Sequence, residues 1–426
     1  MNKLKFLVGL CALAMIGSTI FSGCKGKDGE IGPAGANGSN GTNGIDGVDA
    51  NETCKLCHNP EKVDLVVEQY EFSKHSYGEA AFEESGNTTC GACHTSMGFK
   101  YVVENNVPAT FTVGTNGKYA NDYQASSSNA YGEIVCFTCH SSLHTTYTAE
   151  DLPALTTTAA VSMTMWGGAK SINLAADGGR SNLCVKCHQP RPVTTSTSTS
   201  DGNVLDYAAL VSAPTATFYD NTSSSNKVSL SFRSGNHYGS VGAIYAGVGG
   251  VEFGTGYTNS PHTTVASCQD CHMATVTGRA GGHTFFAKGN FNGCNVTGCH
   301  ETSPLSSTAT KFTTTRATIK GLLEQLATKI NTLGDGNPLL LIDTDTEANL
   351  WYNSTSAHYD GYLNLYNSSS NPGGYYGATG NPKFPNLTNA QFGTILNFQL
   401  VLREYSLGIH NTAYTQKLLE NSLTAW

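Results

Sequence analysis

Cysteine and histidine follow one repeated spacing in this chain. Twelve of its 14 cysteines fall in six short pairs, and a histidine directly follows the second cysteine of every pair. Two residues separate the cysteines in five of the pairs, and four residues separate them in the sixth. The groups are Cys54, Cys57 and His58; Cys90, Cys93 and His94; Cys136, Cys139 and His140; Cys184, Cys187 and His188; Cys268, Cys271 and His272; and Cys294, Cys299 and His300.

This spacing is typical of c-type haem attachment. Both thiols can bond to the vinyl groups of one porphyrin, and the following imidazole then lies under the iron. Zinc ribbons also pair cysteines, but they do not need a histidine after every second cysteine. A disulfide framework would fix neither the spacing nor the histidine. The sequence therefore predicts six haem c groups, the sixth bound through a rarer, longer form of the motif.

Seven of the 13 histidines lie outside the motifs, and six haems with two imidazoles each would need six of them. We predict that His358 is the spare, because its flanks carry no second signal. His144 follows His140 by four residues, too close to bind the same iron from the opposite side, so we expect it to serve a neighbouring haem. The predicted second axial ligands are His75, His144, His237, His262, His283 and His410. Haems without methionine ligands tend toward lower potentials.

Two segments around these histidines resemble bacterial multihaem c-type cytochromes. One is 259–285, with His262 before and His283 after the fifth motif, and the other is 408–419, which contains His410. The resemblance implies that these three histidines are axial ligands. It also implies a fold of irregular coil and short α-helices organised around haems, with little β-structure and a helical C-terminal region. Haem number, chain length and export signal are similar to those of hexahaem outer-surface cytochromes of extracellular electron transfer.

Electron transfer in respiratory or extracellular pathways is the function that this resemblance implies, without a catalytic residue. The alternative is a multihaem reductase of a small inorganic substrate, which needs one haem with an open coordination position. Nitrite reductases of this broad type have a motif that ends in lysine, whereas all six motifs here end in histidine. A stalk protein with incidental haems is a third, weaker reading. The expected partners are other cytochromes or an extracellular electron acceptor.

The N-terminus is predicted to be a lipoprotein signal peptide, residues 1–23. Lys3 and Lys5 precede an apolar run, 6–21, that is short for a membrane span. The run leads to a lipobox-like segment, 21–24, although Phe21 replaces the usual leucine. We expect Cys24 to carry the lipid, and the alternative is an ordinary signal peptide with a chance cysteine. This places the protein in a bacterial cell envelope, at the outer membrane, facing the periplasm or the exterior.

The rest of the chain divides by composition. Residues 24–50 hold the anchor and a glycine at every third position, which indicates a tether or, alternatively, a short collagen-like trimer. Residues 51–305 carry the six motifs, and 306–426 form the helical region that contributes a ligand. Its apolar residues recur at helical spacing between Ile319 and Leu333 and again from Thr388, with a further helix expected over 411–423.

Composition and charge also bound the function. The formal net charge of -8 argues against a nucleic-acid partner and favours a basic protein or a positively charged mineral surface. Hydrophobic residues make up 39% of the chain, a modest supply for a core of this length. Haems are large apolar plates, and we expect them to supply part of the missing core.

Overall fold

Helix α15 (Asn389–Arg403) is buried along nearly its whole length in this computed structural model. It begins with a capping box: the Thr388 hydroxyl accepts a hydrogen bond from the Gln391 amide, and the Gln391 side chain accepts one from the Thr388 amide. Two donors that the first turn of a helix leaves unpaired are satisfied in this way. The sequence pattern places the start of a helix at this point.

The spacing of Phe392, Ile395, Phe398 and Val401 predicts one apolar face, yet α15 is buried on all sides. Its polar side chains make this possible by hydrogen bonding to neighbouring backbone. Asn397 accepts from the Val251 amide at 2.8 Å and donates to the Val251 carbonyl at 2.8 Å. Buried polar groups are tolerated when their hydrogen bonds are satisfied.

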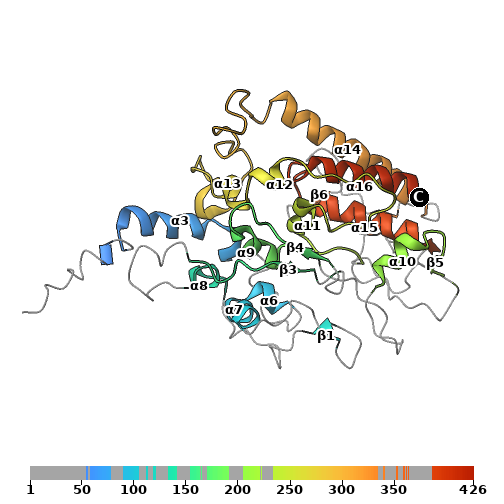
Figure 1. Ribbon diagram of the computed structural model, residues 1–426, viewed down its shortest axis with the longest axis horizontal. Coiled ribbons are helices and arrows are strands. Elements are labelled where there is room, and N and C mark those ends of the chain that lie inside the picture. Colours follow the sequence, from blue (N-terminus) through green and yellow to red (C-terminus); the bar gives the residue numbers. More distant parts are fainter. Residues whose placement is uncertain are drawn as a thin grey trace, which may run out of the picture. The chain divides into compact units, whose positions relative to one another are not determined.

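Helices α14 (Thr310–Asn331) and α16 (Thr412–Ala425) pack against α15 and against each other, as the orange and red ribbons of Figure 1 show. The α14 side chains in this core include Ile319, Leu323 and Leu326. Both helices agree with the periodicity of the sequence, except that α14 begins earlier and ends at Asn331. The core also takes in apolar residues between 205 and 253.

Shorter helices occupy the earlier part of the chain. They are η1 (Pro60–Asp64), α3 (Leu65–Glu71), α4 (Lys74–Tyr77), α6 (Gly91–His94), α7 (Ser96–Glu104), α8 (Cys136–Cys139), α9 (Arg180–Cys187), α10 (Tyr207–Ser212), α11 (Val241–Ala246), α12 (His262–Val265), α13 (Cys268–His272) and η5 (Gly282–Thr284).

The described strands are two or three residues long and form four antiparallel pairs. The pairs are β1 (Thr112–Val113) with β2 (Tyr119–Ala120), β3 (Val161–Ser162) with β4 (Ser171–Ile172), β5 (Thr217–Tyr219) with β8 (Leu387–Thr388), and β6 (Tyr352–Asn353) with β7 (His358–Tyr359). In the β5–β8 pair, Thr217 lies opposite Thr388, next to the start of α15.

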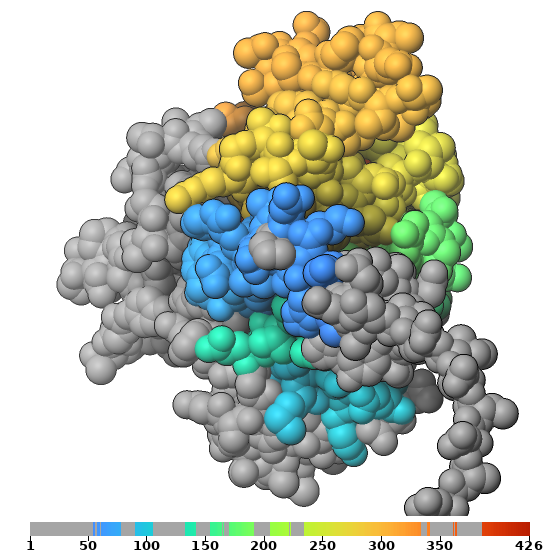
Figure 2. Space-filling view, turned by 90° about the vertical axis from the view of Figure 1, so that its left-hand side faces the viewer, coloured from blue at the N-terminus to red at the C-terminus, as the bar shows by residue number. Residues whose placement is uncertain are grey.

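Segments distant in sequence meet around the motifs. Helix α3 contacts η5, and the blue surface of residues near 70 lies beside the yellow surface of residues near 280 in Figure 2. A small apolar cluster links α9 to α11 through Val185, Ala243 and Tyr245. Helices α6 and α13, which carry motifs, each contact α9, which carries another.

The structure describes residues 54–55, 58–77, 90–104, 112–113, 119–120, 133–141, 154–163, 165, 170–190, 205–220, 222, 234–333, 339–340, 352–353, 358–359, 361, 363 and 386–426. The described residues all belong to one compact unit, Ala50–Trp426. The predicted signal peptide, Cys24, the glycine repeat, Cys57 and His144 lie outside the described residues. Within the described part, no helix has the length and apolar character that a membrane crossing requires.

Candidate functional site

A backbone hydrogen bond returns the histidine to the first cysteine in four of the motifs with two residues between their cysteines. The amide of His94 donates to the carbonyl of Cys90 at 3.1 Å, and the amide of His188 donates to that of Cys184 at 3.0 Å. His58 and His140 make the same bond to the first cysteine of their motifs, at 2.7 and 2.9 Å. A helical turn brings residues three and four apart to one face, so the two cysteines and the histidine are held together.

The sixth motif keeps this bond despite its two extra residues. The His300 amide donates to the Cys294 carbonyl at 3.0 Å, across six positions instead of four. Within the longer turn, the Cys299 amide donates to the Val296 carbonyl at 3.0 Å. The inserted residues therefore enlarge the turn without separating its two ends.

Five imidazole pairs are the main feature of the site. In every pair, one ring belongs to a motif histidine and the other to a histidine outside the motifs. The ring centres are 6.1 Å apart in four pairs and 6.3 Å apart in the fifth. The pairs are His188 with His75, His94 with His237, His300 with His262, His272 with His410, and, at 6.3 Å, His140 with His283.

The partners come from separate elements. His75 is in α4, His262 begins α12 and His283 is in η5, whereas His237 precedes α11 and His410 precedes α16. The structure thus places five of the six predicted second ligands beside a motif histidine. His58 is exposed, and the sixth predicted second ligand, His144, lies outside the described residues. His358, the predicted spare, lies in β7.

The spacing within the pairs suits two ligands of one metal ion. Metal–imidazole bonds are about 2 Å long, so two imidazoles on opposite sides of an ion hold their ring centres roughly 6 Å apart. Within the described ranges no group of three or more His, Cys, Asp or Glu converges on a metal site. Two protein ligands do not complete a zinc site, which takes four. A haem iron needs only two from the protein, because the porphyrin supplies the rest.

Backbone carbonyls orient several of these rings. Nδ1 of His188 lies 3.0 Å from the Gly239 carbonyl oxygen, and Nδ1 of His272 lies 2.8 Å from that of Phe285. Nδ1 of His262 lies 3.3 Å from the carbonyl oxygen of Ile409. A hydrogen bond at Nδ1 fixes the tautomer and leaves Nε2 free to bind a metal.

Burial keeps several of the imidazoles neutral. Burial, with the neighbouring His188 and His272, lowers the pKa of His75 to about 4. Burial is also the largest cause that lowers the pKa of His188, His272 and His283. Neutral imidazole is the form that binds metals, so these rings need not lose a proton near neutral pH.

Thiols of different motifs touch one another. The thiols of Cys187 and Cys93 are hydrogen-bonded to each other. Cys184, in the same motif as Cys187, shares a hydrogen bond with Cys268 of the next motif. Cys271 in turn shares one with Cys294. The second, fourth, fifth and sixth motifs therefore follow one another in a row.

Residues between the cysteines hold neighbouring motifs in place. In the fifth motif, Gln269 donates to the Asp177 carboxylate at 2.7 Å, and that carboxylate also accepts from the amide and hydroxyl of Ser181 in α9. The Ser181 hydroxyl accepts from the Cys268 amide at 3.0 Å. Ser267 and Asp270 form a capping box at the start of α13: each side chain accepts a hydrogen bond from the other residue's amide. Gln269, one of the two residues between the cysteines of this motif, thus helps to connect α13 to α9.

Three residues outside the motifs hold site residues in place, and the sequence analysis did not predict them. Gln69 of α3 accepts a hydrogen bond from the His283 amide at 3.0 Å, which fixes η5. Asp177 joins two motifs, and Glu404 contacts His410 at 2.5 Å. The only local signal is the position of Glu404 six residues before a candidate ligand, which is too weak to select it. Comparison with known protein families, curated proteins and solved structures finds no match to this chain.

Proposed function

We propose that this chain binds six haems covalently and transfers electrons between redox partners at a bacterial envelope surface. The observation that carries the proposal is the set of five imidazole pairs. Each pair joins one motif histidine to one non-motif histidine at a spacing that fits a single metal ion. Haem is the metal group whose attachment also uses the two cysteines beside each motif histidine.

The residues available to hold each haem follow from these pairs. The thiols of each motif would form the thioether bonds, and the paired imidazoles would bind the iron from both sides. If His358 is the spare, His58 and His144 remain for the first motif. The bound haems supply one-electron chemistry. The residues of the chain would provide the iron ligands, exclude water and fix the positions of the haems relative to one another.

Motif contacts support electron transfer over catalysis. Motifs whose thiols touch would bring their cofactors close together, as an electron carrier requires. The row runs from Cys93 to Cys187, then through Cys184 and Cys268 to Cys271 and Cys294. Each imidazole pair would supply two protein ligands to its iron, whereas a reductase needs an open coordination position. We propose that Cys24 and the tether hold this redox unit at the membrane.

Mass spectrometry of the mature protein, combined with optical and EPR spectroscopy, tests the proposal. We expect the polypeptide mass plus six haems and low-spin signals only. No added haem mass would refute it, and a mass reduced only by lost hydrogens would identify the touching thiols as disulfides. A high-spin haem that binds carbon monoxide in the wild-type protein would favour the reductase instead.

A further inference from the structure

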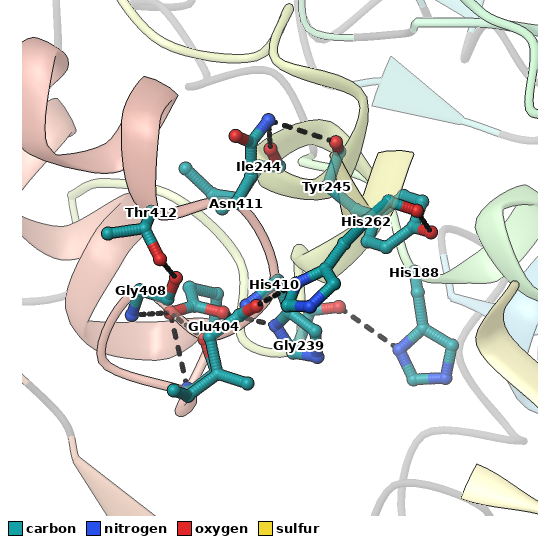
Figure 3. Close-up of polar contacts among 12 residues, drawn as sticks. His188, Gly239, Ile244, Tyr245, His262, Glu404, Gly408, His410, Asn411 and Thr412 are labelled. Atoms are coloured by element: carbon teal, nitrogen blue, oxygen red, sulfur yellow. Dashed lines mark hydrogen bonds and ion pairs between the residues drawn. The ribbon is translucent and has the colours of Figure 1, made fainter. Parts of the chain in front are cut away.

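Glu404 lies directly behind one of the paired imidazoles. It follows the last residue of α15, and its side chain is fully buried, with an exposed fraction of 0%. One carboxylate oxygen, Oε2, lies 2.5 Å from Nδ1 of His410 (Figure 3). His410 is itself paired with His272. His410 thus contacts both the carboxylate of Glu404 and the ring of a motif histidine.

The loop 404–410 is built around this carboxylate. Its other oxygen, Oε1, accepts hydrogen bonds from the amide of Ser406 at 3.2 Å, from the hydroxyl of Ser406 at 2.8 Å and from the amide of Gly408 at 3.4 Å. The His410 amide donates to the same Ser406 hydroxyl at 3.1 Å. Tyr405 and Leu407 adopt left-handed backbone conformations, with φ of 65° and 53°. Such conformations persist where the surroundings over-determine them, so the carboxylate is held firmly against the ring.

His410 differs from four other imidazoles of the site in the group that faces its Nδ1. Nδ1 of His188, His262 and His272 faces a neutral backbone carbonyl, as does Nδ1 of His237, which lies 2.8 Å from the Tyr238 carbonyl oxygen. Nδ1 of His410 instead faces the fully buried carboxylate of Glu404, whose Oε2 lies 2.5 Å away. The carboxylate therefore acts on this ring more strongly than a carbonyl would.

We propose that Glu404 is a positioning residue that lowers the midpoint potential of the haem held by Cys268, Cys271, His272 and His410. The inference rests on the proposed haem ligation. A carboxylate at Nδ1 fixes the ring and makes its other nitrogen a stronger electron donor. A stronger donor and a buried negative charge both favour the oxidised iron, because the oxidised state carries one more positive charge.

Spectroelectrochemical titration of Glu404→Gln in the haem-loaded, full-length protein tests the inference. Glutamine keeps an oxygen that accepts from Nδ1 and removes the charge. We expect one of the six midpoint potentials to shift to a more positive value while all six haems remain low-spin. The matched control is Glu252→Gln, which removes a charge from a half-buried glutamate that instead contacts Tyr414 and Lys170. It should leave the six potentials in place.

Unchanged potentials in Glu404→Gln, with six low-spin haems, would overturn the inference and leave the proposed function intact. An equal shift in Glu252→Gln would also overturn it, because the effect would then be one of net charge. If the variant does not mature, EPR of the oxidised wild-type protein decides. One low-spin signal should show the smaller g anisotropy of an axial imidazole with imidazolate character, and its absence would refute the role of Glu404. Absence of haem from the wild-type protein would contradict the proposed function itself.

Discussion

At the scale of residues, each motif is held by a local turn, whereas the imidazole paired with it comes from a distant segment. The cysteines and the histidine of a motif are held together by a local turn, as in the bond from the His188 amide to the Cys184 carbonyl. The second imidazole arrives from a distant element, as His75 does from α4. Loss of a second imidazole should therefore leave covalent attachment intact and change only the coordination of one iron.

His237→Ala tests this separation. We expect six haems to remain attached and one of them to become high-spin and to bind carbon monoxide, because His237 is the described partner of His94. Added imidazole should restore the low-spin signal by filling the space of the lost ring. His358→Ala, the predicted spare, should change neither signal. A fully low-spin His237→Ala protein would argue against ligation by this residue.

At the scale of elements, α15 organises the fold because it is buried on all sides and is fitted closely to its neighbours. A side chain added at Gly393 would place its first carbon 2.6 Å from the Phe253 ring and 3.0 Å from Val251. Gly321 in α14 has no such neighbour within 4 Å. The two positions are both helical glycines, and they differ in the space around them.

Alanine substitutions at the two glycines should therefore have opposite effects. Gly393→Ala forces a buried ring to move and should lower the free energy of unfolding by about 1–3 kcal/mol. Gly321→Ala removes the conformational freedom of glycine in a helix and should raise it by about 0.5–1 kcal/mol. Thermal or denaturant unfolding followed by circular dichroism measures both changes. Equal effects at the two sites would contradict this account of α15 packing.

The contact of α9 with α13 should depend on pH through Asp177. Burial raises the pKa of Asp177, but hydrogen bonds from Ser181 and Gln269 lower it more, so the folded pKa lies below the ordinary value. A lowered pKa stabilises the fold above the unfolded pKa of about 3.9, and this stabilisation is lost as the pH falls through the folded pKa.

Asp177→Asn should accordingly lower the melting temperature at pH 7 and have a smaller effect at pH 3. Ser181→Ala, which removes the hydroxyl donor, should reproduce part of this loss at pH 7. The melting temperatures of the three proteins at both pH values provide the check. A pH-independent effect of Asp177→Asn would show that the carboxylate charge plays no part in the contact.

At the scale of the whole molecule, the apolar core and the motifs occupy different parts of the chain. The large cluster draws on 205–253, α14, α15 and α16, and it contains no motif residue. The smaller cluster reaches the motifs only through Val185 and the partly buried Cys268. We infer that the bound haems supply the missing apolar contacts of the motif segments.

Limited proteolysis of protein made without haem attachment tests this division. We expect cleavage within 54–141 and 262–305, while α14, α15 and α16 remain resistant. The haem-loaded protein should resist cleavage in both parts, because attachment couples to folding, as metal binding does. Equal resistance of the motif segments without haem would show that they fold on their own contacts.

Local features could be predicted from the order of residues alone. Six cysteine–histidine motifs are visible because a thiol pair and a histidine recur at one short spacing. The C-terminal helices are visible because 3.6-residue periodicity and caps such as Thr388 are local. Which imidazole faces which motif was decided only by the tertiary structure. His94 and His237 are brought together by packing between distant segments, which no spacing rule encodes. The same holds for Glu404, because its contact with His410 depends on how the loop 404–410 folds.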